Sequence, residues 1–219
     1  MTDALHIAPG ETRIGDHRRD VVAIGASAGG IESLCRLLEA LPSNLPAIVL
    51  VAQHRPIHRE SRLRQVLSRH SPLPVEVVHD KQELRHGVCY IGQPSRHLLI
   101  GPGLRSILLE DHFYRSHNID ALFNSLALHA GPRTIGVILS GLLKDGAQGL
   151  AAIKQAGGIA LVQSPEEAAY GDMPRAALKL MGQVDLVGPL DALAAAICRS
   201  AQPAVNFAKA AAHSCERLI

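Results

Sequence analysis

The sequence predicts an α/β fold: a doubly wound, mostly parallel sheet with helices on both faces and a short hairpin excursion. Short apolar runs alternate with amphipathic helical patterns through most of the chain, which is typical of strand-helix-strand units. The runs VVAIGA, AIVLVA and TIGVIL are almost wholly apolar, as expected for strands inside a parallel sheet. With 219 residues and 47% hydrophobic content, the chain can bury one sizeable core, so we expect one domain.

The first half of the chain gives the first repeats of this alternation. A polar, unpatterned lead over residues 1–19, which we expect to be flexible, is followed by a predicted strand from Val21 to Ile24. A helix is expected from Ile31 to Ala40, and turn residues separate it from a second buried strand, Ala47 to Ala52. Leucine and valine then recur at helical spacing within residues 60–70, which predicts an amphipathic surface helix.

The pattern changes between Leu73 and Leu109. Glycine and proline here separate four short apolar pieces, VEVV, VCYI, HLLI and SILL. Such pieces predict hairpins or short edge strands rather than another strand-helix-strand unit. We therefore expect this region to form an excursion at the edge of the sheet.

The second half of the chain returns to regular alternation. A core-facing helix is predicted from Asn118 to His129, with Asn118 as its N-cap. We expect residues 201–219 to form a C-terminal helix or tail, which leaves one domain over residues 20–200. The other expected elements are strands over 134–139, 159–162 and 184–187, and helices over 147–156, after Met173-Pro174, and over 189–199.

Composition argues against several classes of function. The net charge is +2 with both signs interspersed, and aromatic residues make up 3%, so neither a cationic face nor a stacking platform for nucleic acid is expected. The apolar runs are far shorter than the roughly 20 residues of a membrane span, so we expect no membrane insertion. The N-terminus does not resemble a secretory signal, which makes the cytoplasm the expected location.

The four cysteines, Cys35, Cys89, Cys198 and Cys215, lie far apart and form no C-x-x-C pair. Their spacing matches neither a zinc site nor the disulfide framework of a small secreted domain. We interpret them as buried or incidental thiols, and we expect no metal site.

A candidate nucleophile follows the first predicted strand. Ser27 lies between Gly25 and Gly29 on a tight strand-to-helix turn, which is the G-x-S-x-G pattern of a nucleophile elbow. Glycines relieve crowding around such a serine, and the helix N-terminal N–H groups beside it can hold a developing oxyanion. The alternative for this stretch alone is a glycine-rich turn that cradles phosphate.

Three side chains of complementary chemistry follow strands of the predicted sheet. Ser27, His54 and Asp145 come after the first strand, the second strand and the strand over 134–139, and the carboxyl ends of parallel strands share one edge. A serine nucleophile needs a base and an acid that orients the base, which are the residue types present. Taken singly, His54 could be a hydrogen-bonded structural residue and Asp145 could cap the helix that follows it.

Two alternatives to catalysis can be compared on the same residues. A dinucleotide fingerprint requires G-x-G-x-x-G and an acidic residue after the second strand, whereas Ser27 replaces the middle glycine and Gln53-His54 follows the strand. A phosphate-binding P-loop would have a lysine after the glycines, and none is present. A binding module that uses the same edge without turnover remains the other alternative to a hydrolase.

The motifs together resemble a known family. The segments GASAGG (25–30), AQHRP (52–56), CYIGQPSRHLLI (89–100), IDALFNSLALHAG (119–131), GVILSGLLKDGAQG (136–149) and DMPRAAL (172–178) resemble the catalytic domain of CheB, the protein-glutamate methylesterase of bacterial chemotaxis. The resemblance implies hydrolysis of γ-glutamyl methyl esters on chemoreceptors, and in some members deamidation of receptor glutamines. It implies Ser27, His54 and Asp145 as the catalytic triad and no metal or organic cofactor. Backbone N–H groups near Ala28 or Leu142 would form the oxyanion hole.

The sequence departs from the family pattern in three places, which affect the expected regulation, oxyanion site and substrate. The receiver domain that usually precedes the esterase does not fit in residues 1–20, so we expect any regulator to be a separate protein. Ser140, Leu142 and Leu143 replace threonine, methionine and glycine of the T-G-M-G-x-D-G motif, close to the expected oxyanion site. Ser116-His117-Asn118 replaces R-P-S, so His117 and Asn118 are candidate substrate-loop residues. We expect hydrolysis of small activated esters but poor activity on methylated chemoreceptors.

Overall fold

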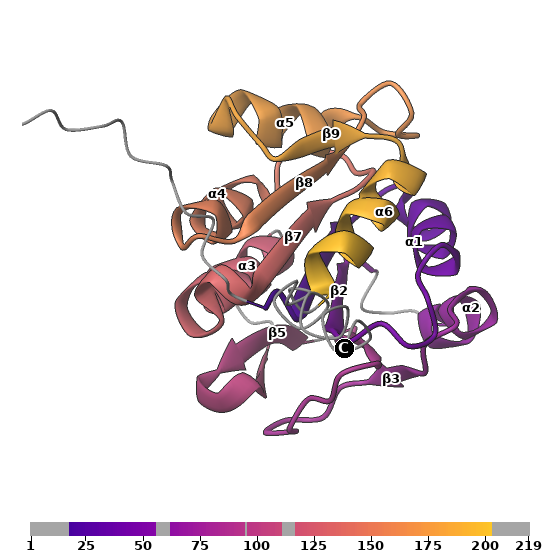
Figure 1. Cartoon of the computed structure of the whole chain (residues 1–219), viewed down its shortest axis with the longest axis vertical. Coiled ribbons are helices and arrows are strands. Elements are labelled where there is room, and N and C mark those ends of the chain that lie inside the picture. The colour runs from indigo at the N-terminus through magenta and orange to yellow at the C-terminus, as the bar shows by residue number, and fades with distance from the viewer. Residues whose placement is uncertain (1–17, 56–61, 95, 111–116, 203–219) are drawn as a thin grey trace, which may run out of the picture.

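The computed structural model describes residues 18–55, 62–94, 96–110 and 117–202. Within these ranges the chain forms a seven-stranded sheet in the order β3-β4-β2-β1-β7-β8-β9, and every strand pair in it is parallel. The predicted fold class is therefore confirmed (Figure 1). The strands are β1 (Val21–Ala26), β2 (Ile48–Gln53), β3 (Val75–Val77), β4 (Cys89–Ile91), β7 (Thr134–Ile138), β8 (Ile159–Gln163) and β9 (Leu186–Gly188).

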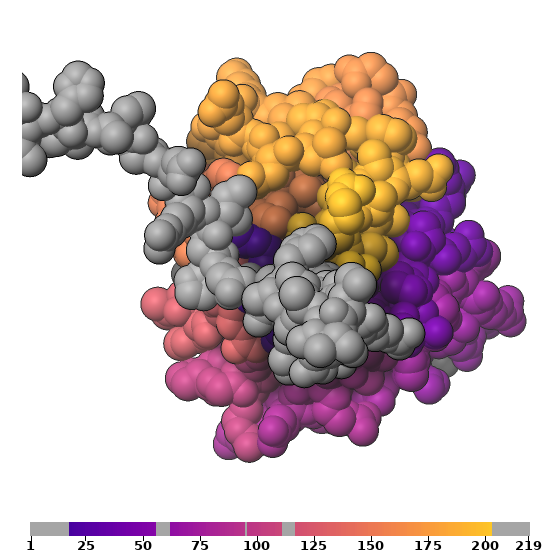
Figure 2. Space-filling model, in the orientation of Figure 1, coloured from indigo at the N-terminus to yellow at the C-terminus, as the bar shows by residue number. Residues whose placement is uncertain are grey.

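Helices cover both faces of this sheet. One face carries α1 (Gly30–Glu39), α2 (Leu63–His70) and α6 (Leu190–Ala201), and the other carries α3 (Asn118–His129), α4 (Ala147–Gln155) and α5 (Asp172–Met181). Figure 2 shows α6, in yellow, lying against the purple α1, although these helices are far apart in the sequence.

A buried hydrophobic core lies between the sheet and the helices on each of its two faces. Because successive side chains of a strand point to opposite faces, Val22 and Ile24 of β1 enter the core beneath α1 and α6. Val21 and Ala23 of the same strand enter the core beneath α3, α4 and α5. Both faces of β1 are thus buried, which accounts for its unbroken apolar sequence.

The region between residues 73 and 109 differs in part from the expectation. The hairpin was predicted correctly: β5 (Arg96–Gly101) and β6 (Arg105–Glu110) pair antiparallel around a short 3-10 turn, Pro102–Leu104. However, β3 and β4 are parallel strands of the main sheet, and α2 serves as the crossover helix that leads to β3. The expectation of no further strand-helix-strand unit is therefore wrong here. Each of these strands has three residues, which is too short for an apolar pattern to reveal its pairing.

An ion-pair cluster closes the amino end of the sheet. Asp20 precedes β1 and is buried, and Arg133, from a second 3-10 turn (Gly131–Arg133) before β7, donates Nε–H and Nη2–H to its two oxygens at 2.8 and 2.9 Å. His86 Nε2 lies 3.0 Å from the same carboxylate. Although burial acts to raise it, the pKa of the Asp20 carboxyl is lowered overall by the hydrogen bonds and charges of Arg133 and His86.

The cysteines agree with the interpretation as ordinary thiols where the structure describes them. Cys35 and Cys89 are buried, Cys198 is partly buried, and all three are free thiols. Burial raises the pKa of the Cys89 thiol to about 12. Cys215, most of the expected N-terminal lead and most of the C-terminal tail lie outside the described residues. Among the described helices, none is long and apolar enough to cross a membrane.

Candidate active site

Ser27, His54 and Asp145 meet at the carboxyl edge of the sheet. His54 Nδ1 lies 3.0 Å from Ser27 Oγ, and His54 Nε2 lies 2.7 Å from Asp145 Oδ2. Each residue follows a different strand, namely β1, β2 and β7, and β1 lies between the other two in the sheet. The convergence therefore arises from the parallel topology, as the strand ends indicated.

The contacts of the imidazole fix which nitrogen carries its proton. Asp145 offers only acceptor oxygens when ionised, so His54 Nε2–H donates to the carboxylate. This leaves the Nδ1 lone pair free to accept the Ser27 hydroxyl proton. The arrangement couples a serine, an imidazole base and a carboxylate in one hydrogen-bonded chain.

The turn around Ser27 is held from several sides. Its N–H donates to the Ser140 carbonyl at 3.0 Å, and its carbonyl accepts from the Gln53 side chain at 2.9 Å. Gly29 precedes α1 with φ of +69°, and a Cβ there would lie 2.8 Å from the Ala169 Cβ. Since side chains disfavour this backbone region, Gly29 is required for the turn that presents the serine.

Gln53 and Ser140 also support this turn: Gln53 was missing from the sequence-based site, and Ser140 was noted only as a departure from the family motif. Gln53 also donates to the His54 carbonyl at 3.1 Å, so one amide links the backbones of the serine and the histidine. The Ser140 hydroxyl donates to the Ala28 carbonyl at 2.9 Å and accepts from the Tyr170 N–H at 3.0 Å. The sequence marked Gln53 only as the residue before His54, and no local pattern indicates these contacts.

Asp145 has a second role, which corrects two expectations. Its Oδ2 and Oδ1 accept the N–H groups of Ile119 and Asp120, each at 3.0 Å, in the first turn of α3. Asn118 is therefore not the N-cap of α3: His117 occupies that position and makes no capping hydrogen bond through its side chain. Nor does Asp145 cap the helix that follows it, because Gly146 holds the N-cap position of α4. The cap of α3 comes from a loop more than twenty residues away, which local sequence cannot reveal.

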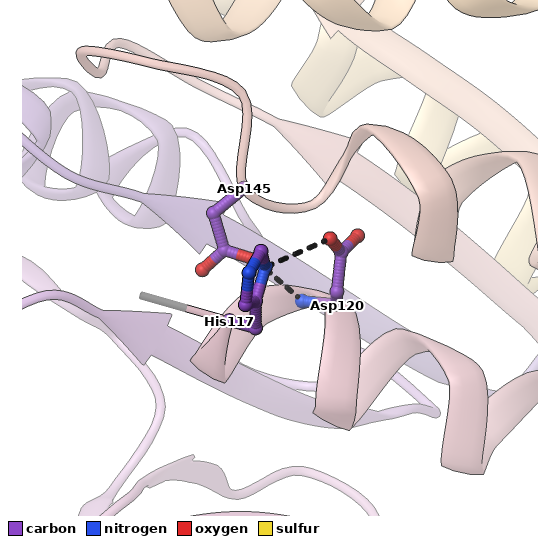
Figure 3. A group of neighbouring side chains, drawn as sticks. All are labelled: His117, Asp120 and Asp145. Carbon is purple, nitrogen blue, oxygen red and sulfur yellow. Dashed lines mark hydrogen bonds and ion pairs between the residues drawn. The ribbon is translucent and has the colours of Figure 1, made fainter. Parts of the chain in front are cut away.

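A buried carboxylate pair lies beneath the start of α3. Figure 3 shows the side chains of His117, Asp120 and Asp145 together. Asp120 Oδ2 lies 3.7 Å from His117 Nδ1. Asp120 Oδ1 accepts the Gly149 N–H at 2.7 Å and so joins α3 to α4. Burial, supported by the nearby charge of Asp145, raises the pKa of the Asp120 carboxyl. An acidic residue in the first turn of a predicted helix was the available signal for Asp120.

This cluster is also the candidate for a cation site among the described residues, since its ligand atoms lie within 4.8 Å of one another. The backbone N–H groups of α3 and α4 already bind both carboxylates. Joining the two helix N-termini therefore accounts for the acidic pair without a metal ion.

The three central residues open into a pocket of about 620 Å³. Its other lining residues are His117, Leu142, Leu143 and Lys144. Five of the seven candidate residues thus lie on this pocket, while Ala28 and Asn118 do not line it. Of the two candidate substrate-loop residues, His117 lines the pocket, whereas Asn118 lies within α3 and does not. Ser116 lies outside the described residues.

Most of the chain matches a known protein family. Residues 22–197 match the family model described as CheB methylesterase. The chain belongs to the CheB methylesterase family. A protein-glutamate methylesterase/protein-glutamine glutaminase of Xanthomonas euvesicatoria is 38% identical over 179 residues, which cover 80% of this chain and 49% of that protein. A protein of the same description from Moorella thermoacetica is 37% identical over 81% of this chain and 43% of its own length.

A solved structure agrees in fold. The CheB methylesterase catalytic domain of Thermotoga maritima has a TM-score of 0.75 and 29% identity, covering 82% of this chain and 97% of that domain. The chain thus spans about half the length of the curated CheB relatives above. Its described core matches nearly all of a CheB catalytic domain.

Proposed function

We propose that the protein is a serine esterase that hydrolyses γ-glutamyl methyl esters of protein substrates and deamidates glutamines at the same site. The observation that carries the proposal is the hydrogen-bonded chain from Ser27 through His54 to Asp145, which opens into a pocket. Membership of the CheB family, and relatives described as methylesterases and glutaminases, support the choice of substrate class.

The geometry supports a two-step mechanism. His54 Nδ1 takes the Ser27 proton as the serine oxygen attacks the ester carbonyl. The same proton then passes to the departing methoxide, so methanol leaves and an acyl-serine remains. A water molecule, activated by the same imidazole, releases the glutamate. The Asp145 carboxylate orients His54 and stabilises the imidazolium that forms twice in this cycle.

The oxyanion of each tetrahedral intermediate needs backbone donors. The Ser27 N–H is engaged with the Ser140 carbonyl, so the donor must come from elsewhere. We propose the N–H groups of Ala28, which lies next to the nucleophile in the turn before α1, and of Leu142, on the pocket wall. Deamidation passes through an analogous tetrahedral intermediate to the same acyl-serine, with ammonia rather than methanol as the leaving group.

We propose methylated chemoreceptors as the protein substrates. His117 takes the place of a proline in the family motif and lines the pocket. Since proline would fix the backbone that enters α3 and histidine does not, we expect weaker receptor activity than in relatives that keep the motif. The double change His117→Pro with Asn118→Ser should then raise receptor demethylation relative to small-ester turnover.

Methanol release from a methylated receptor preparation tests the proposed function. The parent protein should release methanol, and Ser27→Ala should lower the rate by roughly 10⁴ to 10⁶, as loss of a triad serine does elsewhere. Hydrolysis of a small activated ester measured in parallel separates chemistry from receptor recognition. Binding of the receptor with no Ser27-dependent hydrolysis of either substrate would instead favour a binding module on this fold.

A further inference from the structure

Two neighbouring leucines face the catalytic pocket from the loop after β7. Leu142 is 44% exposed and Leu143 is 76% exposed, and both line the pocket that contains Ser27. Single exposed leucines are ordinary on protein surfaces. Two adjacent ones beside a nucleophile place apolar surface where a bound ester must lie.

Leu143 also has a backbone conformation that leucine disfavours. Its φ is +68°, a region in which the Cβ crowds the backbone and which glycine adopts freely. Core packing does not offset this conformation, because the Leu143 side chain is mostly exposed and belongs to neither core. The side chain instead lines the pocket, where it can contact a bound molecule.

Both ends of the short loop are fixed, so its shape is not free to relax. Gly141 donates its N–H to the Tyr170 carbonyl at 2.9 Å and accepts from the Met173 N–H at 3.0 Å. At the other end, Asp145 is held by α3 and by His54. The backbone that carries the two leucines is thus anchored on both sides before any substrate arrives, which lowers the entropic cost of ordering the loop on binding.

We propose that Leu142 and Leu143 form an apolar wall that binds the aliphatic stem of the acyl group and selects esters whose acyl chain extends beyond acetyl. The inference rests on the proposed function, because the occupant is the acyl group that is attached to Ser27 during turnover. A glutamyl ester presents such a stem through its side-chain methylenes. Each methylene that the wall removes from water should strengthen binding about two- to fourfold.

A homologous series of p-nitrophenyl esters tests the wall. For the parent protein, KM should fall by roughly two- to fourfold per methylene from acetate through butyrate to hexanoate. Leu143→Ala and Leu143→Gly should both flatten this dependence. Leu128→Ala is the matched control, because Leu128 is 77% exposed on α3 and does not line the pocket. It should keep the parent's dependence on chain length.

The two Leu143 variants separate the side chain from the backbone. Alanine removes the side chain but keeps the disfavoured φ, whereas glycine removes both. Equal flattening in the two variants supports the wall. A parent-like dependence in Leu143→Ala, with flattening only in Leu143→Gly, would assign the effect to loop conformation and overturn the proposal.

Binding to a variant that does not turn over distinguishes this inference from the proposed function. The dissociation constants of the same esters are measured with Ser27→Ala and with Ser27→Ala combined with Leu143→Ala. The wall predicts tighter binding with chain length in the first and little dependence in the second, whether or not the parent hydrolyses any ester. The same dependence in both proteins overturns the wall, even if the esterase activity is established.

Discussion

Asp20 and Asp145 are each 4% exposed, yet they lie at opposite ends of the sheet and are surrounded by different partners. At the amino end, Asp20 meets a fixed cation, the Arg133 guanidinium, which binds both carboxylate oxygens. At the carboxyl end, the oxygens of Asp145 contact two backbone N–H groups of α3 and the His54 ring. The Asp20 carboxylate is thus paired with a permanent positive charge. The Asp145 carboxylate is paired with backbone N–H dipoles and with an imidazole that can take up a proton.

This difference separates a stabilising group from a catalytic one. A permanent counter-ion satisfies Asp20, so its effect is on folding. Asp145 gains its full counter-charge only when His54 takes up a proton, which is the event that the proposed mechanism requires. Two backbone N–H groups at the N-terminus of α3 hold the Asp145 carboxylate in its orientation before that event. Comparable burial therefore does not imply a comparable role.

The largest expected difference between the two sites is in turnover. Asp145→Asn should lower kcat for a small ester by about 10³ to 10⁴, because an amide disturbs the orientation and tautomer of His54. Asp20→Asn should lower the free energy of unfolding while leaving kcat within about twofold, as expected for a change remote from the site. Steady-state kinetics and urea unfolding of both variants check this. A kcat near the parent's in Asp145→Asn would reduce that residue to a cap of α3.

The next effect concerns stability at the amino end. Arg133→Met should lower the free energy of unfolding by about 1 to 2 kcal/mol, since it leaves Asp20 buried with a weaker set of partners, an effect moderated by the partial exposure of Arg133. Arg175→Met is the control: its pair with Asp172 is 3.9 Å long and exposed, so the change should be below about 0.5 kcal/mol. An equal decrease in the free energy of unfolding in the two variants would show that the Asp20 cluster stabilises the fold no more than an exposed ion pair does.

A smaller effect should appear in the pH dependence of stability. The folded-state pKa of the Asp20 carboxyl is below its ordinary value of 3.8, so its contribution to stability is present above that pH and is lost as the pH falls through the lower folded value. Acid unfolding of Asp20→Asn should therefore be less steep below about pH 4 than that of the parent. If the stability of the two proteins falls equally steeply with decreasing pH, Asp20 does not contribute to stability in acid.

The smallest expected effect is at Leu143. Glycine relieves the backbone at φ of +68° but adds freedom to the unfolded chain, so the two contributions oppose each other. The melting temperature of Leu143→Gly should be unchanged or raised by up to about 3 °C. Leu128→Gly, inside α3, should instead lower it by a few degrees, at about 1 kcal/mol for a glycine in a helix. A clear loss of stability in Leu143→Gly would mean that the leucine supports the fold.

Sequence alone predicted the features that depend on strand order and local pattern. Apolar runs located β1, β2 and β7, and the shared edge of a parallel sheet then brought Ser27, His54 and Asp145 together. Contacts between segments that are distant in the sequence could not be predicted from local pattern. Asp145 caps α3 across a long sequence separation, and β4 lies between β2 and β3 although it follows both in the chain. Local propensity carries no information about such pairings.

The central claim is that His54, oriented by Asp145, activates Ser27, and the rate at which a serine-directed sulfonyl fluoride labels the protein tests it most directly. Peptide mass mapping should place the label on Ser27 in the parent and in Asp20→Asn, at similar rates. In His54→Ala and Asp145→Asn, labelling should be at least about 100-fold slower, because the base is lost or misoriented. Labelling of Ser27 at one rate in all four proteins would contradict the account.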